Sequence, residues 1–173
     1  VTVVDAGGSG CSATDTIEIP ASAVVDITLD ASNSTLSVLC NGFQSDTITV
    51  IATGGTGFAT YQYNIPGVFP TPQYNNVFSG LYAGTYPVVA VDANGCSDTI
   101  NVTISQPDVI YFSATSSDVS CNSGSNGSAW VDAISGGTPP YVYTWSPPSG
   151  NTSSISSLIA GTYTVSVTDV NNC

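Results

Sequence analysis

LIAGTYTVSVTDVNNC spans residues 158–173, and a near copy, LYAGTYPVVAVDANGC, spans residues 81–96. The Tyr, Asp and Cys of the two stretches share one offset (163−86 = 169−92 = 173−96 = 77). A truncated copy, VTVVD, opens the chain at residues 1–5 and is followed by Cys11. Self-similarity at a fixed period indicates a repeat protein, so we interpret the chain as a segment of a tandem array.

Other matches set the boundaries of the repeats. The pair CN at residues 40–41 recurs at 121–122, and GGT at residues 54–56 recurs at 136–138. Short linkers are expected at Pro20 and Pro107. We predict three parts: the C-terminal part of an upstream repeat at residues 1–19, a complete repeat at residues 20–106, and a repeat that lacks its last strand at residues 107–173.

The spacing of apolar residues predicts strands and no helix. Residues 25–29 alternate apolar and polar side chains, which is the period of a half-buried strand. We expect the other strands at residues 1–4, 16–19, 36–38, 47–52, 61–63, 85–91, 99–104, 141–143 and 163–168, with a proline-rich loop at 66–72. Short strands separated by Gly, Pro, Asn and Ser turns are typical of a sandwich of about seven strands. The predicted fold class is therefore all-β, with tandem immunoglobulin-like β-sandwich repeats in an elongated array.

The Gly-Thr-Tyr step of the repeated stretch resembles a tyrosine corner, in which the hydroxyl bonds back to the backbone. Tyr163, Val165 and Val167 are expected to face the core, with the residues between them facing out. In the first repeat Pro87 lies inside the corresponding strand. Because proline removes a ladder hydrogen bond, we expect a bulge or a sheet edge there.

The charge composition narrows the possible partners. The chain of 173 residues carries 12 acidic residues and no Lys, Arg or His, so its formal net charge is −12. Binding to phosphate or to an anionic membrane relies on Lys and Arg, so we expect no nucleic-acid partner and no adhesion through a basic patch. No apolar run is long enough to span a bilayer, so we expect no membrane insertion, and any export signal would lie elsewhere in a longer chain.

The five cysteines point to an oxidising, extracellular setting, because small all-β modules often carry disulfides there. Pairing within repeats would join Cys40 to Cys96 and Cys121 to Cys173 and close loops of similar length (96−40 = 56; 173−121 = 52). A bridge across the junction would join Cys40 to Cys173, and sequential pairing would join Cys11 to Cys40 and Cys96 to Cys121. We favour pairing within repeats, although the two cysteines of an immunoglobulin-like repeat would lie at opposite poles.

No catalytic site is predicted, because the chain has no His or Lys to act as a base beside its many hydroxyl groups. Asp5, Asp92 and Asp169 each precede a turn, where an Asp side chain bonds its own backbone two residues on. The alternative is a Ca²⁺ site built from Asp92, Asn94 and Asp98. Calcium needs six to eight oxygen ligands and this loop supplies few carboxylates, so no cofactor is expected.

Six aromatic residues suggest an alternative function, the carbohydrate-binding module of a secreted enzyme. A sugar platform requires a row of exposed rings, whereas aromatics at every second residue of a strand usually divide between core and surface. The residues are Tyr61, Tyr63, Trp130, Tyr141, Tyr143 and Trp145.

The combined motifs resemble the SprB-type repeat of giant cell-surface adhesins in gliding bacteria. The pattern is CNG or CNS, then GGTPPYxYxW, then LxAGTYxVxVxDxNGC; the second repeat carries nearly all of it, with Asn172 in place of Gly. The first repeat departs from it at residues 57–60 and lacks the Trp. The resemblance implies immunoglobulin-like modules in a long surface filament, exported by the type IX route, used in adhesion and gliding motility, and without a catalytic site.

A second resemblance concerns DTI at residues 15–17, 46–48 and 98–100, which is similar to the O-glycosylation acceptor of the same bacterial group. It implies a glycoprotein modified at Thr16, Thr47 and Thr99; alternatively, DTI merely starts a strand after a turn. We therefore expect a structural and adhesive segment of an extracellular filament at the cell surface. Its expected partners are neighbouring repeats of the same chain, with like chains of the filament and a surface polysaccharide or glycan as further candidates.

Overall fold

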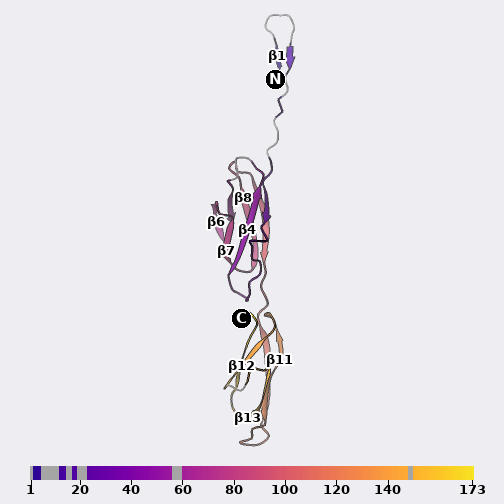
Figure 1. Cartoon of the computed structure of the whole chain (residues 1–173), viewed down its shortest axis with the longest axis vertical. Helices are drawn as coiled ribbons and strands as arrows, with labels where there is room; N and C mark the ends of the chain where they lie inside the picture. The colour runs from indigo at the N-terminus through magenta and orange to yellow at the C-terminus, as the bar shows by residue number, and fades with distance from the viewer. Residues whose placement is uncertain (1, 5–11, 15–16, 19–22, 56–59, 148–149) are drawn as a thin grey trace.

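The computed structural model describes residues 2–4, 12–14, 17–18, 23–55, 60–147 and 150–173 (Figure 1). The described residues contain fourteen strands and no helix that is long and apolar enough to cross a bilayer. The strands are β1 (Thr2–Val4), β2 (Ser12–Thr14), β3 (Asp26–Leu29), β4 (Asp46–Thr53), β5 (Gln62–Ile65), β6 (Phe69–Gln73), β7 (Val77–Leu81), β8 (Gly84–Val91), β9 (Ser97–Ile104), β10 (Tyr111–Ser117), β11 (Gly127–Ser135), β12 (Val142–Ser146), β13 (Ser154–Leu158) and β14 (Thr164–Thr168). The prediction of an all-β chain is confirmed for these residues.

β1 and β2 form an antiparallel hairpin in which Thr2 lies opposite Thr14. The strand predicted at residues 1–4 is therefore present. The partner strand was expected at residues 16–19, and that expectation is wrong for residues 17–18, which lie in no strand. Three residues singled out in the sequence, Asp5, Cys11 and Thr16, lie outside the described residues, as does Pro20.

Strands β3 to β9 form the first lobe of the molecule. One sheet has the order β3-β4-β7 and the other has the order β6-β5-β8-β9. Side chains from both sheets meet in one apolar core, where Ile48, Ile65 and Val88 are fully buried. The alternation of β-branched residues places every second side chain in this core, and burial of such side chains is the main stabilising contribution available to a chain without salt bridges.

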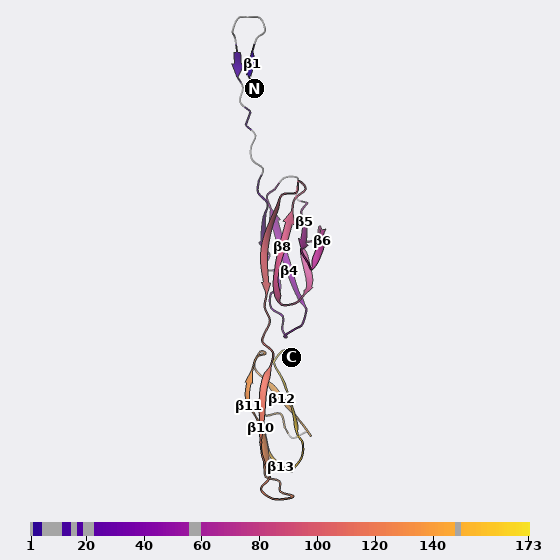
Figure 2. The ribbon, with the colours of Figure 1, turned by 180° about the vertical axis from the view of Figure 1, so that it is seen from behind.

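Proline is accommodated at sheet edges in the first lobe. The segment expected as a proline-rich loop instead contains β6, which pairs only with β5 and lies at the margin of the lobe in Figures 1 and 2. Pro87 lies in β8 before the residues that pair with β5, which begin at Val89. At Pro87, β8 is therefore paired with β9 alone. The prediction of an edge at Pro87 is confirmed, since proline needs no ladder partner on that side.

Not all expected strands form. Residues 36–38 were expected as a strand, but they contribute only an isolated bridge between Ser37 and Ser105, next to one between Thr35 and Thr47. Conversely, β7 and β13 were not predicted. Each contains one extra residue, Gly80 in β7 and Ser157 in β13, at a shift in register with its partner strand, and this interrupts the regular alternation of side chains.

Strands β10 to β14 form the second lobe. Its sheets have the orders β10-β11-β13 and β12-β14, which match β3-β4-β7 and β5-β8 of the first lobe. Strands at the positions of β6 and β9 are not among the described strands of this lobe. Its core is correspondingly small and consists of Ala129, Trp145, Ile155 and Leu158, with Tyr163 and Val165 packed against it.

Both lobes contain the expected tyrosine corner. The hydroxyl of Tyr86 donates to the carbonyl oxygen of Tyr82 at 2.9 Å, and the hydroxyl of Tyr163 donates to that of Ile159 at 3.2 Å. Val165 packs on the core as predicted, while Thr164 is exposed. The corner ties the start of β8 or β14 to the turn that precedes it.

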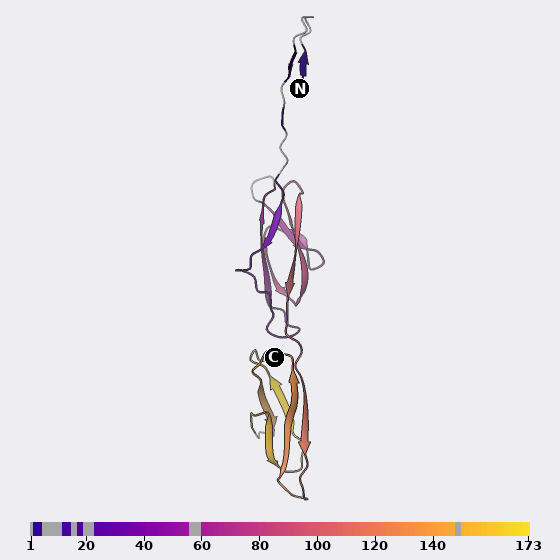
Figure 3. The ribbon, with the colours of Figure 1, turned by 90° about the vertical axis from the view of Figure 1, so that its right-hand side faces the viewer.

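The two lobes follow one another along the long axis of the molecule (Figures 1 and 3). Cys173 does not lie at the far end of the second lobe; the label for the C-terminus in Figure 1 is between the lobes. The turn after β14 therefore meets the turn that precedes β4.

Candidate functional site

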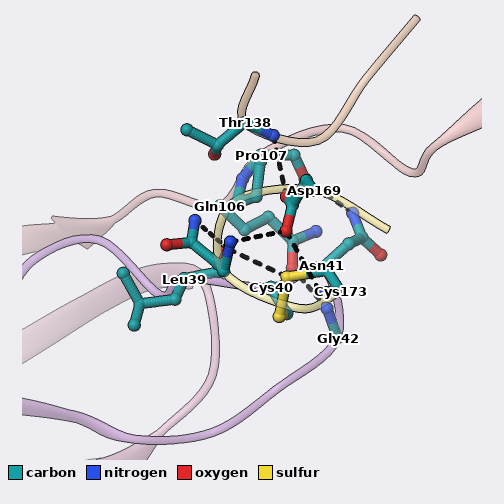
Figure 4. The surroundings of a disulfide bond; sticks show 10 residues. Leu39, Cys40, Asn41, Gly42, Gln106, Pro107, Thr138, Asp169 and Cys173 are labelled. Carbon is teal, nitrogen blue, oxygen red and sulfur yellow. Dashed lines mark hydrogen bonds between the residues drawn. A yellow bond between two sulfur atoms is a disulfide. The ribbon is translucent and has the colours of Figure 1, made fainter. Parts of the chain in front are cut away.

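A disulfide bond joins the two lobes at their junction (Figure 4). It links Cys40, in the turn before β4, to Cys173, after β14, with a Cα–Cα distance of 5.5 Å and a sequence separation of 133. The pairing we favoured, Cys40 with Cys96 and Cys121 with Cys173, is wrong, and so is the sequential pairing. The physical reason is that the two cysteines of one lobe lie at opposite poles, whereas the facing poles of successive lobes bring Cys40 and Cys173 together.

Hydrogen bonds surround the disulfide. The side-chain amide of Asn41 donates to the Pro107 carbonyl oxygen at 2.9 Å, and the Gly42 N–H donates to Gln106 Oε1 at 3.0 Å. From the other lobe, the amide of Asn171 donates to the Leu39 carbonyl oxygen at 3.3 Å. The CN pair of the repeat therefore supplies both a disulfide partner and an amide that binds the linker.

The carboxylate of Asp169 holds the turn that carries Cys173. It is 1% exposed, and one oxygen, Oδ1, accepts the N–H groups of Asn171 at 2.8 Å and Cys173 at 3.0 Å. The other oxygen, Oδ2, accepts the N–H of Thr138 at 2.8 Å. Burial opposes ionisation of this group, but the three N–H donors outweigh it and hold the pKa of Asp169 below its usual value.

The Gly-Gly-Thr motif lets the backbone cross close to this carboxylate. A Cβ on Gly136 would lie 2.0 Å from the carbonyl oxygen of Val109, and one on Gly137 would lie 3.1 Å from Asp169 Oδ2. Both glycines have positive φ, at 75° and 62°, which side chains disfavour. The motif is therefore explained by close approach: Gly136 leaves room for the backbone at Val109, and Gly137 leaves room for the Asp169 carboxylate.

The same arrangement occurs in the first lobe. Asp92 is buried, and its Oδ1 accepts the N–H groups of Asn94 at 2.9 Å and Cys96 at 2.8 Å. A Cβ on Gly55 would lie 2.8 Å from Asp92 Oδ2. The prediction that Asp92 and Asp169 bond their own backbone two residues on is confirmed.

Residues 113–150 match the model of the SprB repeat. This segment is similar to a SprB repeat. It runs from within β10 through β11 and β12, and so includes Cys121, the Gly136–Gly137 pair and Trp145. SprB repeats are non-catalytic repeats of cell-surface adhesins. A search of curated proteins gave no match to the chain.

Two further cysteines have exposed thiols, Cys121 in the second lobe and Cys96 in the first lobe. Cys121 opens a turn in which the Gly124 N–H donates to the Cys121 carbonyl oxygen at 2.9 Å, and the Cys40 turn has the equivalent bond from Phe43 at 3.3 Å. In the Cys96 turn the Asp92 carboxylate accepts two backbone N–H groups, as the Asp169 carboxylate does in the Cys173 turn. The same pair of turns thus recurs in both lobes, bridged at one junction.

The candidate calcium ligands are engaged with backbone donors. Besides the bonds of Asp92, Asp98 Oδ2 accepts the Ile27 N–H at 3.0 Å and Asp98 Oδ1 accepts the Thr99 N–H at 2.8 Å. Within the described part of the chain, no group of three His, Cys, Asp or Glu side chains could hold a metal ion. These carboxylates tie β9 to β3 and shape the turn before it.

The aromatic side chains singled out as a sugar platform do not form an exposed row. Tyr63 and Trp145 are buried in the two cores, and the other four are half-buried. Tyr61 and Tyr141 occupy equivalent positions and donate hydrogen bonds to the carbonyl oxygens of Gly54 and Gly136, both at 2.6 Å. These rings therefore hold the Gly-Gly crossing in place.

Of the glycosylation candidates, Thr99 is exposed at the start of β9 and Thr47 is half-buried in β4. The N–H of Thr47 donates to Thr35 Oγ1 at 2.9 Å. Thr99 therefore offers the more accessible hydroxyl of the two. Sequence analysis did not single out the junction residues Asn41, Gln106 and Asn171; only the CN pair of the repeat pointed to one of them.

Proposed function

We infer that this chain is a structural and adhesive segment of a long extracellular surface filament, built of tandem immunoglobulin-like repeats. The match of residues 113–150 to the SprB repeat supports a cell-surface adhesin. The observation that carries the proposal is the disulfide between Cys40 and Cys173, because it fastens one pole of a lobe to the facing pole of the next. A covalent link at this position serves an elongated array, and it fits an oxidising compartment outside the cell.

The junction favours a fixed relation between successive repeats. Short Pro-containing linkers limit bending, and the bonds from Asn41 and Asn171 reach across from opposite sides of the same disulfide. Small cores that unfold easily on their own gain most from such cross-links. Adhesion and gliding motility, export by the type IX route, and lateral contact with like chains belong to the same proposal.

Small-angle scattering tests the architecture. The oxidised chain is expected to scatter as a rod, and the Cys40→Ser chain is expected to show a broader distribution of inter-lobe distances. A compact, globular profile for the oxidised chain would contradict the proposal.

Labelling of intact cells that produce the parent protein tests the location. An antibody raised against this chain is expected to stain the cell surface, and the staining is expected to disappear after treatment with proteinase K. Trypsin serves as the matched control, because the described segment has no Lys or Arg for it to cleave. Staining only after the cells are permeabilised would refute a surface filament.

A further inference from the structure

The outer face of the sheet β10-β11-β13 carries an aromatic ring beside a carboxylate. Ala129 and Val131 of β11 pack in the core of the second lobe, so Trp130 between them points to the opposite face of the sheet. Trp130 is only half-buried there. Its Nε1 donates to Asp132 Oδ1 at 2.5 Å, and Thr115 Oγ1 donates to Asp132 Oδ2. The indole ring is therefore fixed at the surface with a carboxylate at its edge.

A β-bulge supplies this carboxylate. The register between β10 and β11 skips Asp132, which is the extra residue of β11 between Val131 and Ala133. β-Bulges re-aim individual side chains. The bulge thus lets one carboxylate reach both Trp130 of its own strand and Thr115 of the neighbouring strand.

Hydroxyl groups surround the ring and the carboxylate. Trp130 pairs with Thr115 of β10 and with Ser154 of β13, so these three side chains form one row across the sheet. The next row on the same face consists of one serine from each strand, Ser117, Ser128 and Ser156. In these two rows the face offers a ring, a carboxylate at its edge and hydroxyls, and no aliphatic side chain.

The first lobe does not present this surface. Thr49 is the counterpart of Trp130, with the offset of the CN pair (130−49 = 121−40 = 81), and it is 6% exposed. The segment before β4 covers it. Thr49 Oγ1 donates to the Asn33 carbonyl oxygen at 2.8 Å, and the Thr49 N–H donates to Ser34 Oγ at 2.9 Å.

The covering segment is three residues shorter in the second lobe. In each lobe an N–H of the Gly-Gly pair donates to a carbonyl oxygen ahead of this segment, that of Val24 in the first lobe and that of Asp108 in the second. From there to the cysteine of the CN pair the chain takes 16 steps in the first lobe and 13 in the second (40−24 = 16; 121−108 = 13). The shorter segment runs as β10, and Thr115 and Ser154 on either side of Trp130 are exposed.

Charge decides which class of ligand suits this face. The chain has no Lys, Arg or His and a formal net charge of −12, so it repels acidic sugars, phosphates and acidic peptides. Each oxygen of Asp132 accepts one hydrogen bond from the protein and, as a carboxylate oxygen, has a further lone pair for a ligand hydroxyl. The C–H groups on the face of a pyranose ring are positively polarised, and the face of an aromatic ring is negative. A neutral saccharide therefore matches both groups.

We propose that the Trp130 face, formed by the two rows described above and Asp132, binds a neutral polysaccharide of glucose-type pyranose rings. Equatorial hydroxyls leave such a ring with a flat C–H face, which stacks on Trp130. Hydroxyls at the edge of the ring donate to Asp132, and the serine row binds the neighbouring sugar unit. The inference deepens the proposed adhesive function and rests on it, because it names the class of surface to which the filament adheres.

Cellohexaose, a neutral β-1,4-linked glucose oligomer, is the probe for this face. Titrated into the full chain labelled with ¹⁵N, it is expected to shift the indole N–H resonance of Trp130 in a saturable manner. The indole N–H of Trp145, which donates to the Thr152 carbonyl oxygen at 3.0 Å, is expected not to move. Oligogalacturonate of the same length is expected to cause no shift, because it is anionic. Added salt is expected to leave the affinity for cellohexaose within about twofold, because no ion pair is screened.

Substitutions separate the ring from the carboxylate, with binding measured by calorimetry. Trp130→Ala is expected to weaken binding at least about tenfold, and Trp130→Phe is expected to weaken it less because a smaller ring remains. Asp132→Ala is expected to weaken binding by about tenfold through the lost acceptor. Tyr74→Ala is the matched control, since it removes a ring that is 71% exposed in the first lobe, and it is expected to leave the affinity within about twofold. Should Trp130→Ala fail to fold, the indole titration of the unsubstituted chain still decides.

Three results would overturn the proposal: no indole shift at about 10 mM cellohexaose, a shift confined to Trp145, or equal binding by Trp130→Ala. A fourth is binding of hexalysine, but not of cellohexaose, at Trp130, which would make the face a site for cations held by the ring and the carboxylate. Each of these would leave the filament in place, since scattering and surface labelling involve no glycan. A compact scattering profile would instead refute the filament and leave the titration unaffected.

Discussion

Replacing Cys40 by Ser is expected to destabilise the second lobe, although Cys40 lies in the first. The disulfide spans a sequence separation of 133, for which the chain-entropy estimate gives about 5 kcal/mol when both lobes unfold. If only the second lobe unfolds, the loop closed by the disulfide runs through roughly 65–70 residues, and the same estimate gives about 4 kcal/mol. This effect is large compared with the small core around Trp145.

Tryptophan fluorescence isolates this effect, because both tryptophans, Trp130 and Trp145, lie in the second lobe. With a urea dependence of about 1–3 kcal/mol/M, a loss of about 4 kcal/mol moves the fluorescence midpoint down by roughly 1.5–4 M. Circular dichroism follows both lobes at once. The Cys40→Ser and unsubstituted chains are expected to coincide in a reducing agent.

Cys121→Ser and Cys96→Ser are the matched controls, because both thiols are free and exposed. Neither is expected to move the fluorescence midpoint. If the disulfides instead joined Cys40 to Cys96 and Cys121 to Cys173, the reverse is expected. Cys121→Ser would then lower the fluorescence midpoint of the second lobe, and Cys40→Ser would not. That reverse pattern, or a Cys40–Cys96 peptide in a non-reducing digest, would refute the junction disulfide.

Three further substitutions test the second lobe. Asp169→Asn is expected to destabilise it at pH 7, since an amide cannot accept all three N–H bonds, while Asp118→Asn, at an exposed position, leaves urea unfolding unchanged. Because the folded-state pKa of Asp169 is lowered, its contribution is present above the unfolded-state value of about 3.9 and is lost as pH falls through the folded-state pKa. The Asn variant should thus show a flatter decline in stability between pH 5 and 2, and an unchanged profile would contradict the role given to this carboxylate. Tyr163→Phe removes the corner hydrogen bond and is expected to cost about 1 kcal/mol in urea unfolding; a cost near zero would count against the corner as a stabilising contact. Gly136→Ala combines a positive φ with a steric clash and is expected to lower the melting temperature more than Gly67→Ala, where φ is 85° and nothing lies within 4 Å; equal shifts would mean that the backbone crossing relaxes easily.

Much of the fold follows from the sequence because local patterns set it. Alternation identified β3, β4 and β9, and the repeated Gly-Thr-Tyr step located the tyrosine corners at Tyr86 and Tyr163. β6 was missed because prolines within it suggested a loop, although an edge strand tolerates proline.

The candidate site could be predicted only in part. The Asp turns were visible in the sequence, because Asp before a turn has a local hydrogen-bonding role. The disulfide partners of Cys40 and Cys173 were not, since loop lengths within and across repeats do not distinguish the pairings and the outcome depends on how the lobes meet.

The disulfide at the junction also provides a mechanical shortcut. Tension applied at Cys173 passes through the sulfur atoms directly to Cys40, so the backbone between these residues carries none of it. At about 3.4 Å per extended residue, the 133 bypassed steps correspond to roughly 450 Å of contour length that stays hidden while the bond is intact. Stretching a single chain by its ends before and after reduction would reveal that length, and the oxidised chain is expected to extend only through the residues that precede Cys40.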